Sequence, residues 1–86
     1  MSEIIINFDK NLGIDKFNKI MSNFTNKNVN VKNNLSFVDK DFLIFAQYNN
    51  QIPVSAKILI KDDIISSELI ELLIKYGIKV RTLASI

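Results

Sequence analysis

Three aspartates follow apolar runs, where strands are expected to lead into helices: Asp9, Asp62 and Asp63. If both strands point the same way, their loops meet at one edge of the sheet, where ligands of open α/β sheets bind. Carboxylate oxygens beside a helix N-terminus could then hold Mg²⁺ and a phosphate. Aspartate is also favoured in helix caps and turns, and this simpler role explains all three residues. We therefore expect no metal site.

Other side chains that carry chemistry are scarce. The chain has no histidine, no cysteine and a single arginine, Arg81, so imidazole bases, thiol nucleophiles and the usual zinc ligands are excluded. The Ser66-Ser67 pair has no histidine to activate it, and Asp39 and Asp41 suit a turn between strands. We expect a protein that is not an enzyme and uses no cofactor.

Lysine and asparagine gather on one side of the first predicted helix and just after it. At helical spacing, four of these residues form a face of one charge: Lys16, Lys19, Asn23 and Lys27. Such a face attracts an acidic protein surface, and lysines also neutralise nucleic-acid phosphates. Binding of single strands needs exposed aromatic rings as well, but Phe17, Phe24 and Phe37 stand at core positions. We expect an acidic protein partner, with weak nucleic-acid binding as the alternative.

The spacing of apolar residues indicates the elements that position these side chains. Residues 3–8 are β-branched and apolar on both faces, which predicts a central strand. From Ile14 the period becomes helical, and the helix should end near residues 25–27. Residues 29–37 alternate between apolar and polar side chains, which predicts a half-exposed strand with a polar middle.

Two further strands are expected at residues 42–48 and 52–60. The first is apolar on both faces, because Leu43 and Phe45 alternate with equally apolar neighbours. Helices on one side of the sheet cannot also cover Leu43 and Phe45 on the other. This second apolar face predicts contact with a partner or with another copy of the chain.

A second helix is expected from Ser66, a suitable N-cap, to Gly77, a suitable terminator. Leucines form its buried stripe, which Tyr76 completes. The residues after Gly77, numbers 78–83, predict a last strand.

The predicted order is β-α-β-β-β-α-β in one domain spanning residues 1–86. The fold class is α/β (α+β), a two-layer sandwich in which both helices cover one face of a mixed sheet. This order is similar to that of ferredoxin-like split β-α-β folds, with one strand added. Architecture of this kind implies no particular function.

Composition narrows the function only broadly. Eleven cations balance nine anions to a net charge of +2, which does not by itself indicate nucleic acid. The chain has no cysteine, no secretion signal and no apolar run near the roughly 20 residues of a membrane helix, so we expect a cytoplasmic protein. Heavy use of Asn, Ile and Lys is typical of AT-rich bacteria and their phages. We expect a small protein-interaction module, such as an inhibitor or adaptor, that binds a protein partner or forms a homodimer.

Overall fold

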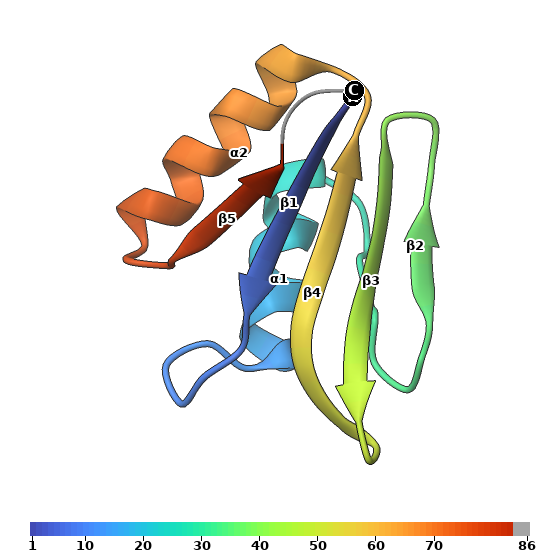
Figure 1. The fold of residues 1–86 in the computed structure, drawn as a ribbon. Coiled ribbons are helices and arrows are strands. Elements are labelled where there is room, and N and C mark those ends of the chain that lie inside the picture. Colours follow the sequence, from blue (N-terminus) through green and yellow to red (C-terminus); the bar gives the residue numbers. More distant parts are fainter. Residues whose placement is uncertain (84–86) are drawn as a thin grey trace.

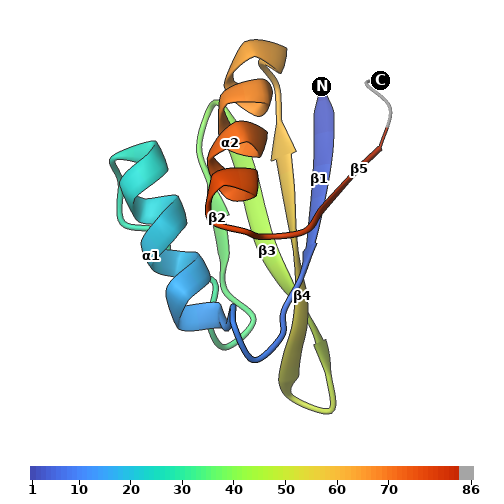
Figure 2. The same ribbon diagram turned by 90° about the vertical axis from the view of Figure 1, so that its left-hand side faces the viewer.

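The computed structural model describes residues 1–83 as two layers, a five-stranded sheet with both helices on one face (Figure 1, Figure 2). The predicted α/β (α+β) class and the two-layer arrangement are confirmed. The elements follow the predicted order: β1 (Ser2–Asn7), α1 (Ile14–Thr25), β2 (Ser36–Val38), β3 (Phe42–Asn49), β4 (Ile52–Ile60), α2 (Asp63–Lys75) and β5 (Val80–Leu83).

The strands lie in the order β2-β3-β4-β1-β5, and each neighbouring pair is antiparallel. The prediction of a mixed sheet is therefore wrong. Strands β4 and β5 do run in the same direction, as their connection through α2 requires, but β1 lies between them and pairs with both. The likeness to ferredoxin-like folds stays a prediction.

The hydrophobic core fills the space between the sheet and the helices. Alternate residues of the three central strands point toward the helices, as their period of two requires. Fully burying one large apolar side chain stabilises the fold by about 1.5–3 kcal/mol, so this layer holds the domain together. Its largest fully buried side chains come from both helices and from these strands and include Ile4, Ile6, Phe17, Met21, Ile44, Ile58, Ile60, Leu69 and Leu73.

The segment between α1 and β2 is not the long alternating strand that the sequence predicts. Only Ser36–Val38 pair with β3. Val29 and Val31 are buried, and their N–H groups donate to side chains of α1 in place of a neighbouring strand, while the Val31 carbonyl accepts from the Tyr48 hydroxyl of β3. The Val29 N–H donates to Ser22 Oγ at 2.8 Å, and the Val31 N–H donates to Asn18 Oδ1 at 3.0 Å. The alternation therefore predicted the burial of Val29 and Val31 correctly, but it was wrong about their backbone pairing and about Leu35, which is exposed.

Helix α2 begins before the predicted start. Its N-cap is Asp62, whose carboxylate accepts hydrogen bonds from the N–H groups of Ile64 and Ile65. Ser66, predicted as the cap, is buried inside the helix. Ile64 is exposed, so the first turn of α2 lacks the amphipathic pattern by which a sequence reveals a helix.

The turn between β2 and β3 depends on Asp39, as predicted. The Asp39 carboxylate accepts hydrogen bonds from the N–H groups of Asp41 and Phe42, and from Lys27 Nζ at 3.0 Å. Burial raises the pKa of Asp39, but the hydrogen bonds from Lys27 and the two backbone N–H groups together lower it further than burial raises it. The pKa of Asp39 therefore lies below its ordinary value.

We expect Asp39→Asn to reduce the free energy of unfolding by about 1–2 kcal/mol near pH 7, because an amide is a weaker acceptor than an ionised carboxylate. A carboxyl group with a lowered pKa stabilises the fold above its unfolded-state pKa of about 4, and this contribution is lost as the pH falls through the folded-state pKa. Urea unfolding between about pH 7 and pH 3 should show the wild type approaching the variant in stability. A difference that stays constant over this range would contradict the assignment.

Candidate functional site

The residues predicted to bind a partner lie on two sides of the molecule. Those of the lysine-rich face are exposed on α1 or just after it: Lys16, Lys19, Asn23 and Lys27. Leu43 and Phe45 lie on β3 and alternate with buried Phe42 and Ile44, so they point away from the helices. One contact surface cannot include both groups.

The sequence predicts charge of one sign on the lysine-rich face, but the structure places two acidic residues beside it. Lys27 Nζ lies 3.0 Å from Asp39 Oδ2, and Asp15, an acidic residue of α1, pairs with Lys32 in the following loop. These exposed or partly exposed pairs contribute little to stability, but they neutralise part of the face. Lys27 is therefore paired, and binding of an acidic partner by this face stays a prediction.

The outer face of the sheet is less open than the alternation predicts. Leu43 and Phe45 are half-buried, and their partners in register on β4 are Leu59 and Lys57. An ion pair crosses this face, because Lys57 Nζ lies 2.7 Å from Glu3 Oε1 and 6.0 Å from the centroid of the Phe45 ring. The expected apolar patch is therefore divided by charge, and a homodimer through it stays a prediction.

The three aspartates considered as a cation site are not neighbours. Because β1 and β4 are antiparallel, Asp9 follows the end of β1, whereas Asp62 and Asp63 lie near its start. Asp63 accepts a hydrogen bond from the Ser2 hydroxyl at 2.8 Å, and Asp9 Oδ1 accepts two backbone N–H groups of its own loop. Within residues 1–83, no group of three His, Cys, Asp or Glu side chains could hold a metal ion.

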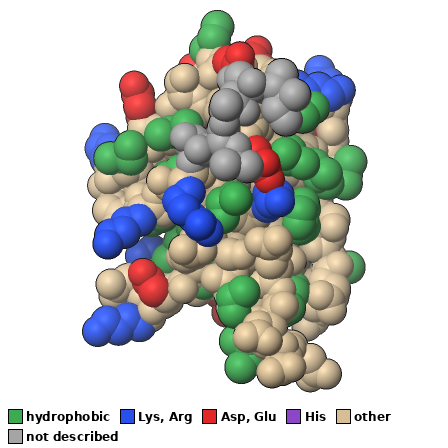
Figure 3. Space-filling view, in the orientation of Figure 1, with side chains coloured by type: hydrophobic (Ala, Val, Ile, Leu, Met, Phe, Trp, Pro, Cys, Tyr) green, Lys and Arg blue, Asp and Glu red, His purple; other side chains and the backbone are tan. Residues whose placement is uncertain are grey.

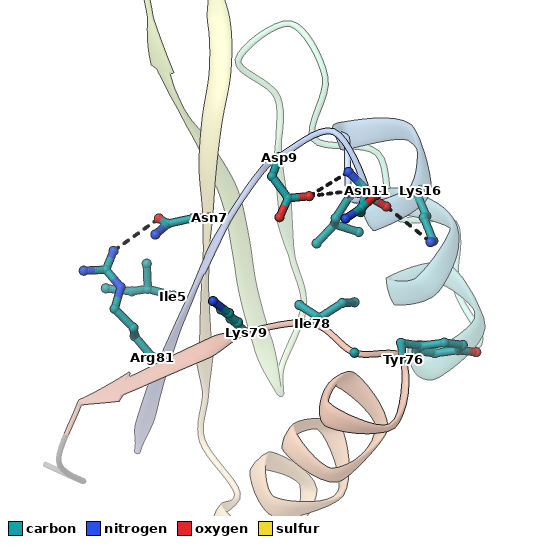
Figure 4. A pocket seen from close by; sticks show the side chains of 11 residues that line it. Ile5, Asn7, Asp9, Asn11, Lys16, Tyr76, Ile78, Lys79 and Arg81 are labelled. Atoms are coloured by element: carbon teal, nitrogen blue, oxygen red, sulfur yellow. Dashed lines mark hydrogen bonds between the residues drawn. The ribbon is translucent and has the colours of Figure 1, made fainter.

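A cleft of about 490 Å³ opens where the β1–α1 loop faces the turn between α2 and β5 (Figure 4). Ile5, Leu12 and Ile78 give it apolar surface. Its charged and amide-bearing side chains come from both ends of the chain: Asn7, Asp9, Asn11, Lys16, Lys79 and Arg81.

The cleft forms because β5 is shorter than β1 at this end of the sheet. Strand β5 begins at Val80, opposite Ile6, whereas β1 continues to Asn7. Gly77 has a φ of +79°, the left-handed conformation that often ends a helix, and its N–H donates to a carbonyl of the last turn of α2 at 2.9 Å. The chain then runs obliquely toward β1 (Figure 1), and Asn7 at the end of β1 lines the cleft.

Positive charge gathers around this cleft, and Figure 3 shows Lys and Arg side chains on both sides of the hollow. Arg81 donates to Asn7 Oδ1 at 3.2 Å, and Lys16 Nζ donates to the Asn11 carbonyl at 3.3 Å. Asp9 is the one carboxylate among the described lining residues, and it already accepts two N–H groups. Within residues 1–83, no carboxylate forms an ion pair with the cations of the cleft, so an anion can enter without breaking one. The cations that would meet it are Lys16, Lys79 and Arg81.

Tyr76 lines the cleft and is 55% exposed, which corrects its predicted place in the core. It is the C-cap of α2, so it lies where the helical period ceases to apply. Figure 4 shows its side chain on the same side of the cleft as Lys16. The cleft thus combines cations with an exposed aromatic ring.

Sequence reasoning missed Lys79 and Arg81 as neighbours of Lys16. Only the pairing of β1 with β5 brings these residues together, and no local pattern reports such pairing. The sequence offers one short indication of these cleft residues. Gly77, which ends the helix, is soon followed by two cations, Lys79 and Arg81, on either side of Val80.

No protein-family model, curated protein or solved structure matches the chain. Within residues 1–83, no helix is long and apolar enough to cross a membrane. The cleft is therefore the feature of the molecule from which a function can be inferred.

The chain's two glycines give a matched test of the turn that shapes the cleft. We expect Gly77→Ala to lower the free energy of unfolding by about 1–2 kcal/mol, because a Cβ is strained at positive φ even though nothing lies within 4 Å of it. Gly13→Ala meets equally open space at an extended φ of −96° and should change stability by less than about 0.5 kcal/mol. Equal effects of the two substitutions in thermal or urea unfolding would contradict the role given to Gly77.

Proposed function

We propose that the chain is a non-enzymatic protein-interaction module that binds an acidic segment of a partner protein in the cationic cleft. One observation carries this proposal. Lys16, Lys79 and Arg81 come from two ends of the chain and line one cleft, in which Asp9 Oδ1 accepts two backbone N–H groups. In a chain with a net charge of only +2, this is a local concentration of positive charge.

The arginine and the lysines of the cleft would contribute to binding of an acidic segment in different ways. A guanidinium has five N–H donors and binds a carboxylate through two of them. Within residues 1–83, the Arg81 side chain donates one hydrogen bond, to the Asn7 side chain. Lys16 and Lys79 act as point charges that attract an acidic segment from a distance. The apolar surface beside them favours a peptide over a free inorganic anion, because a peptide also buries apolar groups.

The kinds of side chain in the described part of the cleft support a binding role. No histidine or cysteine exists in the chain, and no serine or threonine lines the cleft within residues 1–83. Asp9 Oδ1 accepts two N–H groups of its own loop. A cytoplasmic inhibitor or adaptor from an AT-rich bacterium or phage needs none of these groups, and this role is part of the proposal.

A short peptide of alternating glutamate and threonine is the probe for this function. We expect the double variant Lys79→Glu with Arg81→Glu to bind it about 10- to 100-fold more weakly than the wild type, measured by fluorescence anisotropy, because two attractive contacts become repulsive.

The matched control is Lys40→Glu with Lys61→Glu, two exposed lysines near the other end of the sheet. This variant changes the net charge by the same amount but should alter the affinity by no more than about twofold at physiological salt, where distant charges are screened. Equal losses in both variants, or no binding to the wild type, would contradict the proposal.

Single-stranded nucleic acid is a second candidate, because Tyr76 offers an exposed ring beside the cations. We expect binding of a labelled oligothymidine to vanish by physiological salt, since a few cations release few counterions. Tyr76→Ala should then have little effect at low salt. Tight binding that survives physiological salt and is lost in Tyr76→Ala would put nucleic acid in place of the acidic peptide.

A further inference from the structure

Strand β5 and the residue before it carry two of the cations that line the cleft, Arg81 and Lys79. Strand β5 is one of the two edge strands of the sheet, and β1 is its neighbour on the inner side. An edge strand offers backbone N–H and C=O groups to any extended chain that approaches it. Which groups β5 offers follows from the hydrogen-bond pattern of the strands beside it.

Successive residues of a strand in an antiparallel sheet direct their N–H and C=O groups to opposite neighbours. The Phe8 N–H donates to the Val54 carbonyl at 2.9 Å, directly beyond the paired residues of β1 and β4. The even-numbered residues of β1 therefore bond to β4, and the odd-numbered residues bond to β5.

This alternation fixes the orientation of β5. Ile5 is odd-numbered and lies opposite Arg81, so Arg81 uses its backbone groups on β1. Val80 and Thr82 consequently direct their N–H and C=O groups away from the sheet, and no described strand pairs with them there.

The charges beside this edge select the chain that can join it. Lys79 and Arg81 flank Val80, and both are exposed. Cations on an edge oppose pairing with a second copy of β5, because like charges would meet. The same cations attract an extended segment that carries carboxylates. The opposite edge, β2, has no such cluster, since Lys40 beside it is accompanied by Asp39 and Asp41.

We propose that the acidic segment binds as a sixth strand along β5, with its backbone on Val80 and Thr82 and its carboxylates on Lys79 and Arg81. The inference rests on the proposed function and specifies how the partner is held. Strand addition of this kind draws affinity from backbone hydrogen bonds and specificity from alternate side chains. Because Lys79 and Arg81 also line the cleft, the added strand and the cleft share these two cations.

Amide hydrogen exchange, followed by NMR with and without saturating glutamate-threonine peptide, tests the inference. We expect exchange at Val80 and Thr82 to slow by at least about tenfold in the complex, because their N–H groups gain acceptors. Arg81 serves as the internal control, since its N–H already bonds to β1 and should change much less. Peptide binding with unchanged exchange at both Val80 and Thr82 would overturn strand addition.

Peptides N-methylated on alternate residues give a second readout that leaves the protein unaltered. An added strand directs the N–H groups of one alternate set toward β5 and those of the other set toward solvent. We expect methylation of one set to weaken binding by more than about tenfold and methylation of the other set to be tolerated. Tolerance of both sets would overturn strand addition while the proposed function stands, whereas failure of the unmethylated peptide to bind would remove the proposed function itself.

Discussion

The placement of β1 between β4 and β5, antiparallel to both, is the constraint on which the rest of the structure depends. Ile4 and Ile6 are fully buried toward the helices, whereas Ile5 points to the other face. A slip of one residue would exchange these faces. At about 1.5–3 kcal/mol for each buried isoleucine, such a slip would remove a large part of the stability of so small a domain. The register of β1 is therefore strongly specified.

The placement of β1 also determines which loops lie at the same end of the sheet and can form one site. Antiparallel pairing of β1 with β4 sends their two following loops to opposite ends of the sheet, so Asp9 and Asp62 cannot share a ligand. It also brings the start of β5 to the end of β1, where the β1–α1 loop already lies. The cationic cleft is thus a product of strand direction and unequal strand length, and no contiguous motif encodes it.

Sequence reasoning succeeded where local spacing determines structure. The limits of α1, the order of the elements and the alternation of Ile44 with Phe45 follow from periods of 3.6 and 2 residues. It failed where a side chain takes the place of the hydrogen-bond partner or helix cap that the sequence predicts. Val31 is buried without a strand because Asn18 accepts its N–H, and Asp62 in place of Ser66 caps α2.

The candidate site was only partly accessible to such reasoning. Lys16 was identified from its position on α1, but its neighbours in the cleft lie at the other end of the chain. Strand direction is set by contacts that are distant in sequence, so the pattern around Lys79 and Arg81 could indicate a strand and not its neighbours. The ion pair of Lys27 with Asp39 was hidden for the same reason.

Carbodiimide cross-linking of the glutamate-threonine peptide to the protein, mapped by mass spectrometry, tests the central claim most directly. The chain's ten lysines are distributed over its surface and report where the carboxylates lie. The account predicts cross-links concentrated at Lys16 and Lys79, with few at Lys19 or Lys40. Cross-links concentrated at Lys19 and Lys27, or spread evenly over all lysines, would contradict a binding site in the cleft.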